Sequence, residues 1–142
     1  MIEFEVKERI MPIGEKKGQT VYFAAPKTQQ RITPRQLEDE IVRATSLARG
    51  DVRNALTTLA EFVNSGLQRG ASVDLGDLGL IKVVIGSQMM DKPEDVTAST
   101  LKTPSIRFFA KQEMLEAAKK VKVKVVNAYT KTVSDNDPAT PE

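Results

Sequence analysis

One long amphipathic segment constrains this chain of 142 residues more than any other feature. Between residues 51 and 68, apolar side chains recur at spacings of 4, 3, 4 and 4, the period of one helix face; they are Val52, Leu56, Leu59, Val63 and Leu67. Ala55, Ala60 and Phe62 widen this stripe beyond what one short neighbouring helix covers. The sequence therefore predicts a helix that Gly70 ends, with part of its apolar surface buried against another subunit.

A shorter helix is predicted just before this one. Thr33 and Gln36 have the spacing of a capping box, and Pro34 suits the first helical position because its missing N–H has no partner there anyway. The apolar residues that follow share one helix face to about Thr45, and they are Leu37, Ile41 and Ala44. Two helices in succession are therefore expected.

After Gly70 the period changes to that of a β-strand. Residues 73–75 alternate, residues 80–85 form a β-branched run after a Gly76-Asp77 turn, and residues 105–109 read as a returning strand. This pattern predicts a β meander. The connection over residues 86–103 has little apolar periodicity, and its length favours a functional loop or a two-stranded arm that projects from the meander.

The N-terminal segment is predicted to be a two-stranded ribbon over residues 2–25. Ile2, Phe4 and Val6 alternate with charged residues, and residues 20–24 form a second strand after a turn that contains two glycines. A lone hairpin is marginal in water, so this ribbon is expected to pack on the rest of the molecule or on a partner.

The C-terminal part is predicted to be a short helix followed by a tail. The apolar residues Met114, Leu115, Ala118 and Val121 have helical spacing, and lysines occupy the other side of that helix. Residues 128–142 contain one lysine and three acidic residues and have no apolar period, so we expect a disordered acidic tail.

The composition excludes several kinds of chemistry. The chain has no Cys, His or Trp, which removes disulfides, thiolate and imidazole metal ligands and the Ser-His-Asp arrangement. The acidic residues do not have the spacing of a calcium-binding loop. Chemistry by carboxylate, Lys, Ser or Tyr side chains remains open, but no constellation of such residues supports an enzyme. We therefore expect no catalysis, no cofactor, no metal and no small-molecule substrate. The sequence shows no signal peptide and no apolar run near the ~18 residues of a membrane span, so a cytoplasmic protein without a membrane partner is expected.

Three motifs carry a family resemblance. Residues 46–52, Ser-Leu-Ala-Arg-Gly-Asp-Val, are similar to a G-L-S-x-x-D-A junction between two helices. Residues 67–81 are similar to the pattern L-x-x-G-x-x-V-x-L-x-G-F-G-T-F, and residues 106–108 match a strand that returns from an arm. With this order of elements, residues 32–125 resemble the HU/IHF family of bacterial histone-like DNA-binding proteins. The N-terminal ribbon is similar to the extension of a divergent HU-like subgroup found in Bacteroidetes.

The resemblance implies an α+β, HU/IHF-like fold. Its expected parts are two N-terminal helices, a β meander with an extended arm, and a short C-terminal helix, to which this chain adds its N-terminal β ribbon. The corresponding division is an N-terminal β extension over residues 1–30, an HU-like DNA-binding domain over residues 31–127, and the acidic tail over residues 128–142.

The resemblance also implies a function. Proteins of this family are homodimers that bind double-stranded DNA without strong sequence preference, contact its backbone, and reach along the minor groove with arms whose prolines kink the duplex. We therefore expect an architectural protein of the cytoplasmic nucleoid, and whether it bends DNA is left open. The expected DNA-binding residues are Lys82, Lys92, Pro93, Lys102, Arg107, Lys111, Lys119 and Lys122.

The arm of this chain differs from the family pattern. The family arm is rich in Arg, whereas residues 86–101 have no Arg and contain Asp91, Glu94 and Asp95. Like charge disfavours phosphate contacts. Met89 and Met90 are candidate apolar wedges beside Pro93. A second hypothesis therefore remains open: an HU-fold dimeric protein-interaction module that has lost strong DNA binding. Homodimer and heterodimer also remain open.

Overall fold

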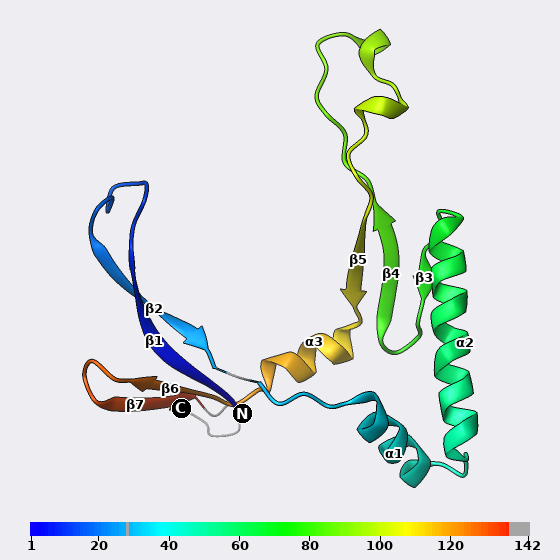
Figure 1. Ribbon diagram of the computed structural model, residues 1–142, viewed down its shortest axis with the longest axis horizontal. Coiled ribbons are helices and arrows are strands. Elements are labelled where there is room, and N and C mark those ends of the chain that lie inside the picture. Colours follow the sequence, from blue (N-terminus) through cyan, green and yellow to red (C-terminus); the bar gives the residue numbers. More distant parts are fainter. Residues whose placement is uncertain (28, 137–142) are drawn as a thin grey trace. The chain divides into compact units, whose positions relative to one another are not determined.

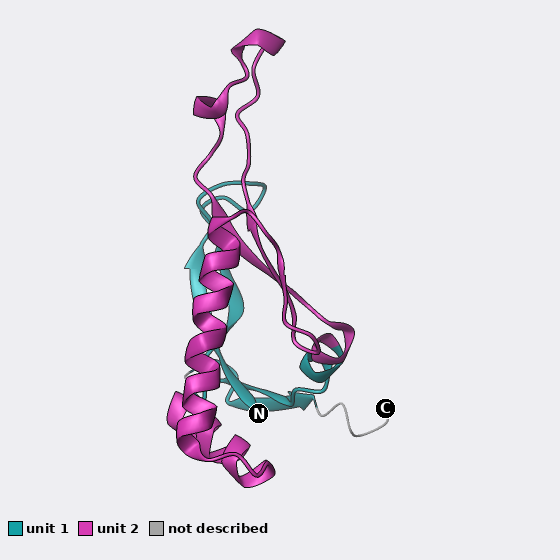
Figure 2. Cartoon of the chain, turned by 90° about the vertical axis from the view of Figure 1, so that its right-hand side faces the viewer, with its two compact units in different colours: residues 1–32, 116–142 teal, residues 33–115 magenta. Residues whose placement is uncertain are grey.

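The computed structural model describes residues 1–27 and 29–136, and within them it has a mixed α+β structure with three α-helices and two β-sheets. Backbone contacts divide the chain into two units (Figure 2). Residues 1–32 and 116–142 form one unit, and residues 33–115 form the other. The expected mixed α+β class is confirmed.

The second unit begins with two helices, as the sequence predicts. Helix α1 (Pro34–Ala44) starts with a complete capping box: the Gln36 N–H donates to Thr33 Oγ1 at 3.2 Å, and the Thr33 N–H donates to Gln36 Oε1 at 2.9 Å. Helix α2 (Arg49–Gln68) ends just before Gly70, whose φ of 76° is the left-handed conformation that glycine adopts without steric cost.

A three-stranded antiparallel sheet follows in the order β3-β4-β5 (Figure 1). Its strands are β3 (Val73–Asp74), β4 (Gly79–Val84) and β5 (Ser105–Ala110). Gly79 is required at the start of β4, since a Cβ there would overlap the Phe109 carbonyl oxygen and lie 2.9 Å from the Phe108 ring. The sequence predicts this meander and its strand order.

The connection between β4 and β5 projects beyond the sheet as an arm (Figure 1). It is two-stranded only at its base, where an isolated bridge joins Ser87 to Leu101. Beyond this bridge the backbone forms two 3₁₀ turns, η1 (Pro93–Asp95) and η2 (Ala98–Thr100). The prediction of a two-stranded arm is therefore wrong for its outer part, because those residues lack the apolar alternation that supports a strand ladder.

The first unit is a four-stranded sheet with the order β2-β1-β6-β7. Strands β1 (Ile2–Ile10) and β2 (Thr20–Pro26) form the predicted N-terminal ribbon. Strand β6 (Val123–Asn127) lies parallel to β1, and β7 (Thr132–Asn136) lies antiparallel to β6. The first two and the last two strands of the described residues therefore share one sheet.

Two expectations for the C-terminal part need correction. Helix α3 (Gln112–Lys119) ends before Val121. Residues 121–125 alternate Val and Lys, Val126 follows, and the β-branched valines favour the strand β6. The expected disorder of residues 128–142 is wrong for β7, whose backbone pairs with β6. Asn127 closes the turn between them, since its Oδ1 accepts the N–H groups of Tyr129 at 3.0 Å and Thr130 at 3.2 Å.

The rest of the predicted tail, residues 137–142, lies outside the described residues. The division into segments 1–30, 31–127 and 128–142 remains a prediction about function. The backbone contacts group residues differently, because β6 lies within the segment 31–127 but pairs with β1 in the N-terminal segment.

Little apolar surface is buried within one chain. Among the described residues, Val52 at 2% exposure is the only buried hydrophobic side chain. On the same helix Phe62 is 70% exposed and Leu59 is exposed, and Leu37 of α1 is exposed as well. A single chain therefore encloses almost no core.

Candidate nucleic-acid interface

Lys82 and Arg107 lie directly opposite each other on neighbouring strands. Lys82 is on β4 and Arg107 on β5, and both are exposed. Strand alternation places them on the sheet face opposite to that of Ile81. Ile81 pairs with Val73, which packs against Gly66 of helix α2, so Lys82 and Arg107 point away from α2. We call Lys82, Arg107 and the neighbouring Phe109 the β4–β5 basic face.

Phe109 supports the lysine of this face. The Lys82 ammonium lies 4.9 Å from the centre of the Phe109 ring, within the range of a cation–π contact. Such a contact orients the ammonium and leaves its positive charge in place. Neither Lys82 nor Arg107 forms an ion pair with any other residue in the described ranges, so both charges face solvent.

Sequence reasoning did not assign Phe109 a role. The signal was present in the sequence, because Phe109 follows Arg107 by two positions and therefore shares its strand face. What could not be read from the sequence was the register that brings Lys82 beside this ring.

The predicted arm residues occupy exposed positions. Lys92 precedes η1, Pro93 is its first residue, and Lys102 lies where the arm returns, with its backbone N–H donating to the Gly86 carbonyl at 2.8 Å. Met89 is 97% exposed. The outer arm therefore presents an apolar side chain and a proline, but over residues 86–101 it has three carboxylates and one ammonium.

The three remaining predicted residues are placed differently. Lys111 forms an ion pair with Asp74 at 3.5 Å, and Lys119 pairs with Glu116 at 3.4 Å, so nearby carboxylates partly offset both charges. Lys122 directly precedes β6, where its carbonyl accepts the Ile2 N–H at 2.8 Å. Lys119 and Lys122 belong to the first unit and Lys111 to the second. The structure thus brings Lys82 and Arg107 together. DNA binding stays a prediction for all eight residues.

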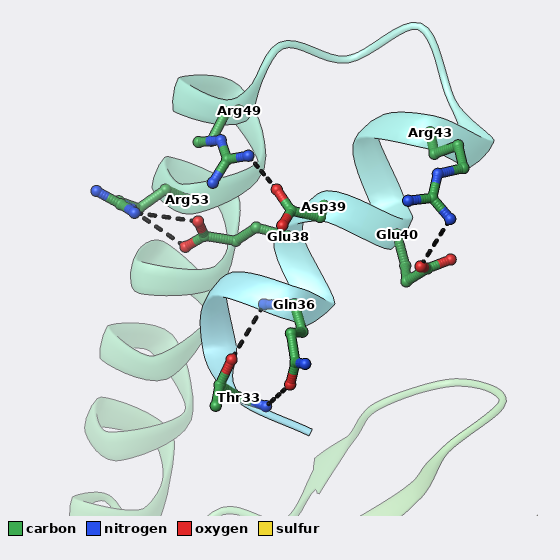
Figure 3. A network of polar contacts seen from close by, with 8 residues as sticks. All are labelled: Thr33, Gln36, Glu38, Asp39, Glu40, Arg43, Arg49 and Arg53. Carbon is green, nitrogen blue, oxygen red and sulfur yellow. Dashed lines mark hydrogen bonds and ion pairs between the residues drawn. The ribbon is translucent and has the colours of Figure 1, made fainter. Parts of the chain in front are cut away.

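A polar network joins helices α1 and α2 (Figure 3). Glu38 is only 5% exposed, and its carboxylate accepts two hydrogen bonds from Arg53, at 3.1 Å from Nε and 3.0 Å from Nη2. Arg49 pairs with Asp39 in the same network. The hydrogen bonds from Arg53 hold the pKa of Glu38 below its ordinary value. This network fixes α1 on α2, and the sequence analysis did not predict it.

Comparisons with known proteins agree with this architecture. A family model named HU-HIG, described as an HU domain fused to wHTH, Ig or glycine-rich motifs, matches residues 1–125. A search of curated proteins found no match. Among solved structures, a crystal structure of a protein from Bacteroides vulgatus, provisionally described as a bacterial DNA-binding protein, is similar with a TM-score of 0.56 at 15% identity.

The similarity to that structure covers 93% of this chain and 57% of the Bacteroides chain, so this chain spans little more than half of its neighbour's length. At this level of identity the likeness concerns the fold. No helix within the described residues is long and apolar enough to cross a membrane.

Proposed function

The chain belongs to the HU-HIG family, and on this premise we propose that it is an architectural, histone-like protein that binds double-stranded DNA without strong sequence preference. The observation that carries the proposal is the β4–β5 basic face, where Lys82 and Arg107 are exposed, adjacent and free of ion pairs with the described residues. Cations of this kind contact phosphates, which gives affinity but no base information. The proposed activity is binding rather than catalysis, and DNA binding places the protein at the nucleoid.

We propose that the binding unit is a homodimer. The apolar stripe of α2 supports this, because Phe62 and Leu59 remain exposed in a single chain and Val52 alone is buried. Exposed apolar side chains that continue a helix stripe are typical of protein interfaces. A second copy of the chain, with the same stripe, supplies a self-complementary partner for it.

We propose that the arm acts on the duplex through apolar contacts. Pro93 and Met89 are the candidate wedges, and the 97% exposure of Met89 leaves it available to enter the minor groove. Inserting an apolar side chain between base steps costs a few kcal/mol of stacking and bends the DNA. The other proposed phosphate contacts are Lys92, Lys102, Lys111, Lys119 and Lys122.

Fluorescence anisotropy tests this function with two duplexes of about 30 base pairs and unrelated sequence, at salt concentrations from about 50 to 200 mM. We expect similar affinities for the two sequences and a steep loss of affinity with salt. Energy transfer between dyes on the duplex ends is expected to rise on binding if the arm bends DNA.

Absence of binding even at about 50 mM salt would contradict the proposal. The acidic outer arm, with Asp91, Glu94 and Asp95, would then favour the other hypothesis, a dimeric module that binds a protein.

A further inference from the structure

The outer part of the N-terminal β1–β2 hairpin extends past the point where β1 pairs with β6. Strand β6 pairs with β1 only from Ile2 to Glu5, whereas the pairing of β1 with β2 continues to Ile10. Residues 6–24 therefore form a two-stranded ribbon with no further described strand on either side (Figure 1). Residues 7–10 and 12–20 are all exposed. The hairpin thus has the form of an arm.

The turn of this ribbon is ordered by its own backbone. The Met11 N–H donates to the Gln19 carbonyl at 3.1 Å, and the Gly18 N–H donates to the Met11 carbonyl at 2.9 Å. Within the turn, the Lys17 N–H donates to the Gly14 carbonyl at 3.1 Å. These bonds order the backbone of the turn and involve none of its side chains.

The charge of the ribbon is opposite in sign to that of the β4–β5 arm. Residues 7–18 contain four cations and two carboxylates, whereas residues 86–101 contain one cation and three carboxylates. Lys7 pairs with Glu5 at 3.2 Å. Arg9, Lys16 and Lys17 form no ion pair with any described residue. The ribbon is therefore electrostatically better suited to phosphate than the arm is.

We propose that the tip of the β1–β2 hairpin is a second DNA-contacting element, in which Arg9, Lys16 and Lys17 bind phosphates of the duplex. This inference rests on the proposed function, because it assigns additional contacts to the same ligand. A two-stranded β ribbon fits a major groove about 12 Å wide, whose edges are lined with phosphates. The hairpin then supplies phosphate contacts that the acidic arm lacks.

The test is the salt dependence of DNA binding by the full chain with Lys16→Ala and Lys17→Ala. Two lost phosphate contacts are expected to reduce the slope of log K against log salt by about 1.8, that is about 0.9 for each contact. A matched control, Arg43→Ala with Arg69→Ala, removes the same charge from exposed positions of α1 and the α2 C-cap and is expected to keep the wild-type slope. Lys16→Arg with Lys17→Arg keeps the charge and is also expected to keep the slope.

Four results would overturn this inference. In the first, Lys16→Ala with Lys17→Ala keeps the wild-type salt slope, while Lys82→Ala with Arg107→Ala reduces it. The hairpin then does not contact DNA, and the proposed function stands. If the Arg43/Arg69 control loses as much slope, the effect comes from net charge alone. If Lys16→Ala with Lys17→Ala binds DNA like wild type but binds phosphatidylserine vesicles more weakly, the ribbon contacts anionic lipid instead of DNA. Wild type that binds no DNA at all would reject both proposals.

Discussion

The Lys82 ammonium lies 4.9 Å from the centre of the Phe109 ring on the neighbouring strand. The ring orients the ammonium on the β4–β5 basic face without removing its charge. This relationship predicts how the β4–β5 basic face responds to substitution.

Phe109→Leu should weaken DNA binding by about two- to fivefold, because an exposed cation–π contact contributes about 0.5–1 kcal/mol. The salt slope should stay unchanged, since no charge is removed. Phe108→Leu is the matched control, because Phe108 lies on the other face of β5. Anisotropy titrations of the two variants check this, and equal affinities for both would show that Phe109 does not support the DNA contact.

Phe62→Asp should abolish dimer formation. Phe62 is 70% exposed in one chain, so an aspartate there has little effect on the packing of that chain and acts mainly where a partner covers the position. Asn54→Asp introduces the same charge on another side of α2 and should leave the dimer intact. Sedimentation velocity at low micromolar concentration distinguishes the two outcomes. A dimer of the Phe62→Asp variant would place the interface elsewhere.

Glu38→Gln should reduce the dependence of stability on acid pH. The bonds from Arg53 lower the pKa of Glu38 in the folded chain, so the ionised carboxylate stabilises the fold above its unfolded pKa. That contribution begins to be lost when the pH falls below about 5, near the pKa of the unfolded chain. It is lost completely once the pH has fallen through the lower pKa of the folded chain. The melting temperature of wild type should therefore fall more steeply between pH 6 and 3 than that of the variant. Parallel curves would contradict this role of the pair.

Ending the chain after Lys131 should lower the melting temperature. This truncation removes β7 and leaves the outer edge of β6 without its backbone partner. Ending the chain after Asn136 keeps β7 whole and serves as the reference. Thermal unfolding followed by circular dichroism compares the two, and identical melting temperatures would mean that β7 does not stabilise the sheet.

Local patterns predicted the elements whose stabilising contacts are close in sequence. The Thr33 capping box, the α2 stripe and the stop at Gly70 are each determined within a few residues. The sheet of the first unit was missed, because its central pairing joins Ile2 to Val123, and periodicity cannot show which distant strand lies beside β1. The strand β7 was missed because residues 132–136 have few apolar side chains and are held by backbone pairing.

The candidate site was predicted in part for a similar reason. Residue type indicated Lys82 and Arg107, but only the register of β4 and β5 shows that they are adjacent. Lys111 and Lys119 had the same residue type and sit beside carboxylates instead. The charge of a lysine is visible in the sequence, whereas its pairing depends on the fold.

The central claim is that the β4–β5 basic face holds the phosphates of DNA, and the salt dependence of affinity for Lys82→Ala with Arg107→Ala tests it most directly. The matched reference is Lys82→Arg with Arg107→Lys, which keeps both charges. We predict that the alanine variant binds all duplexes more weakly, with a slope of log K against log salt smaller than that of wild type by about 1.8, while the charge-preserving variant keeps the wild-type slope. A wild-type slope in the alanine variant would contradict the claim.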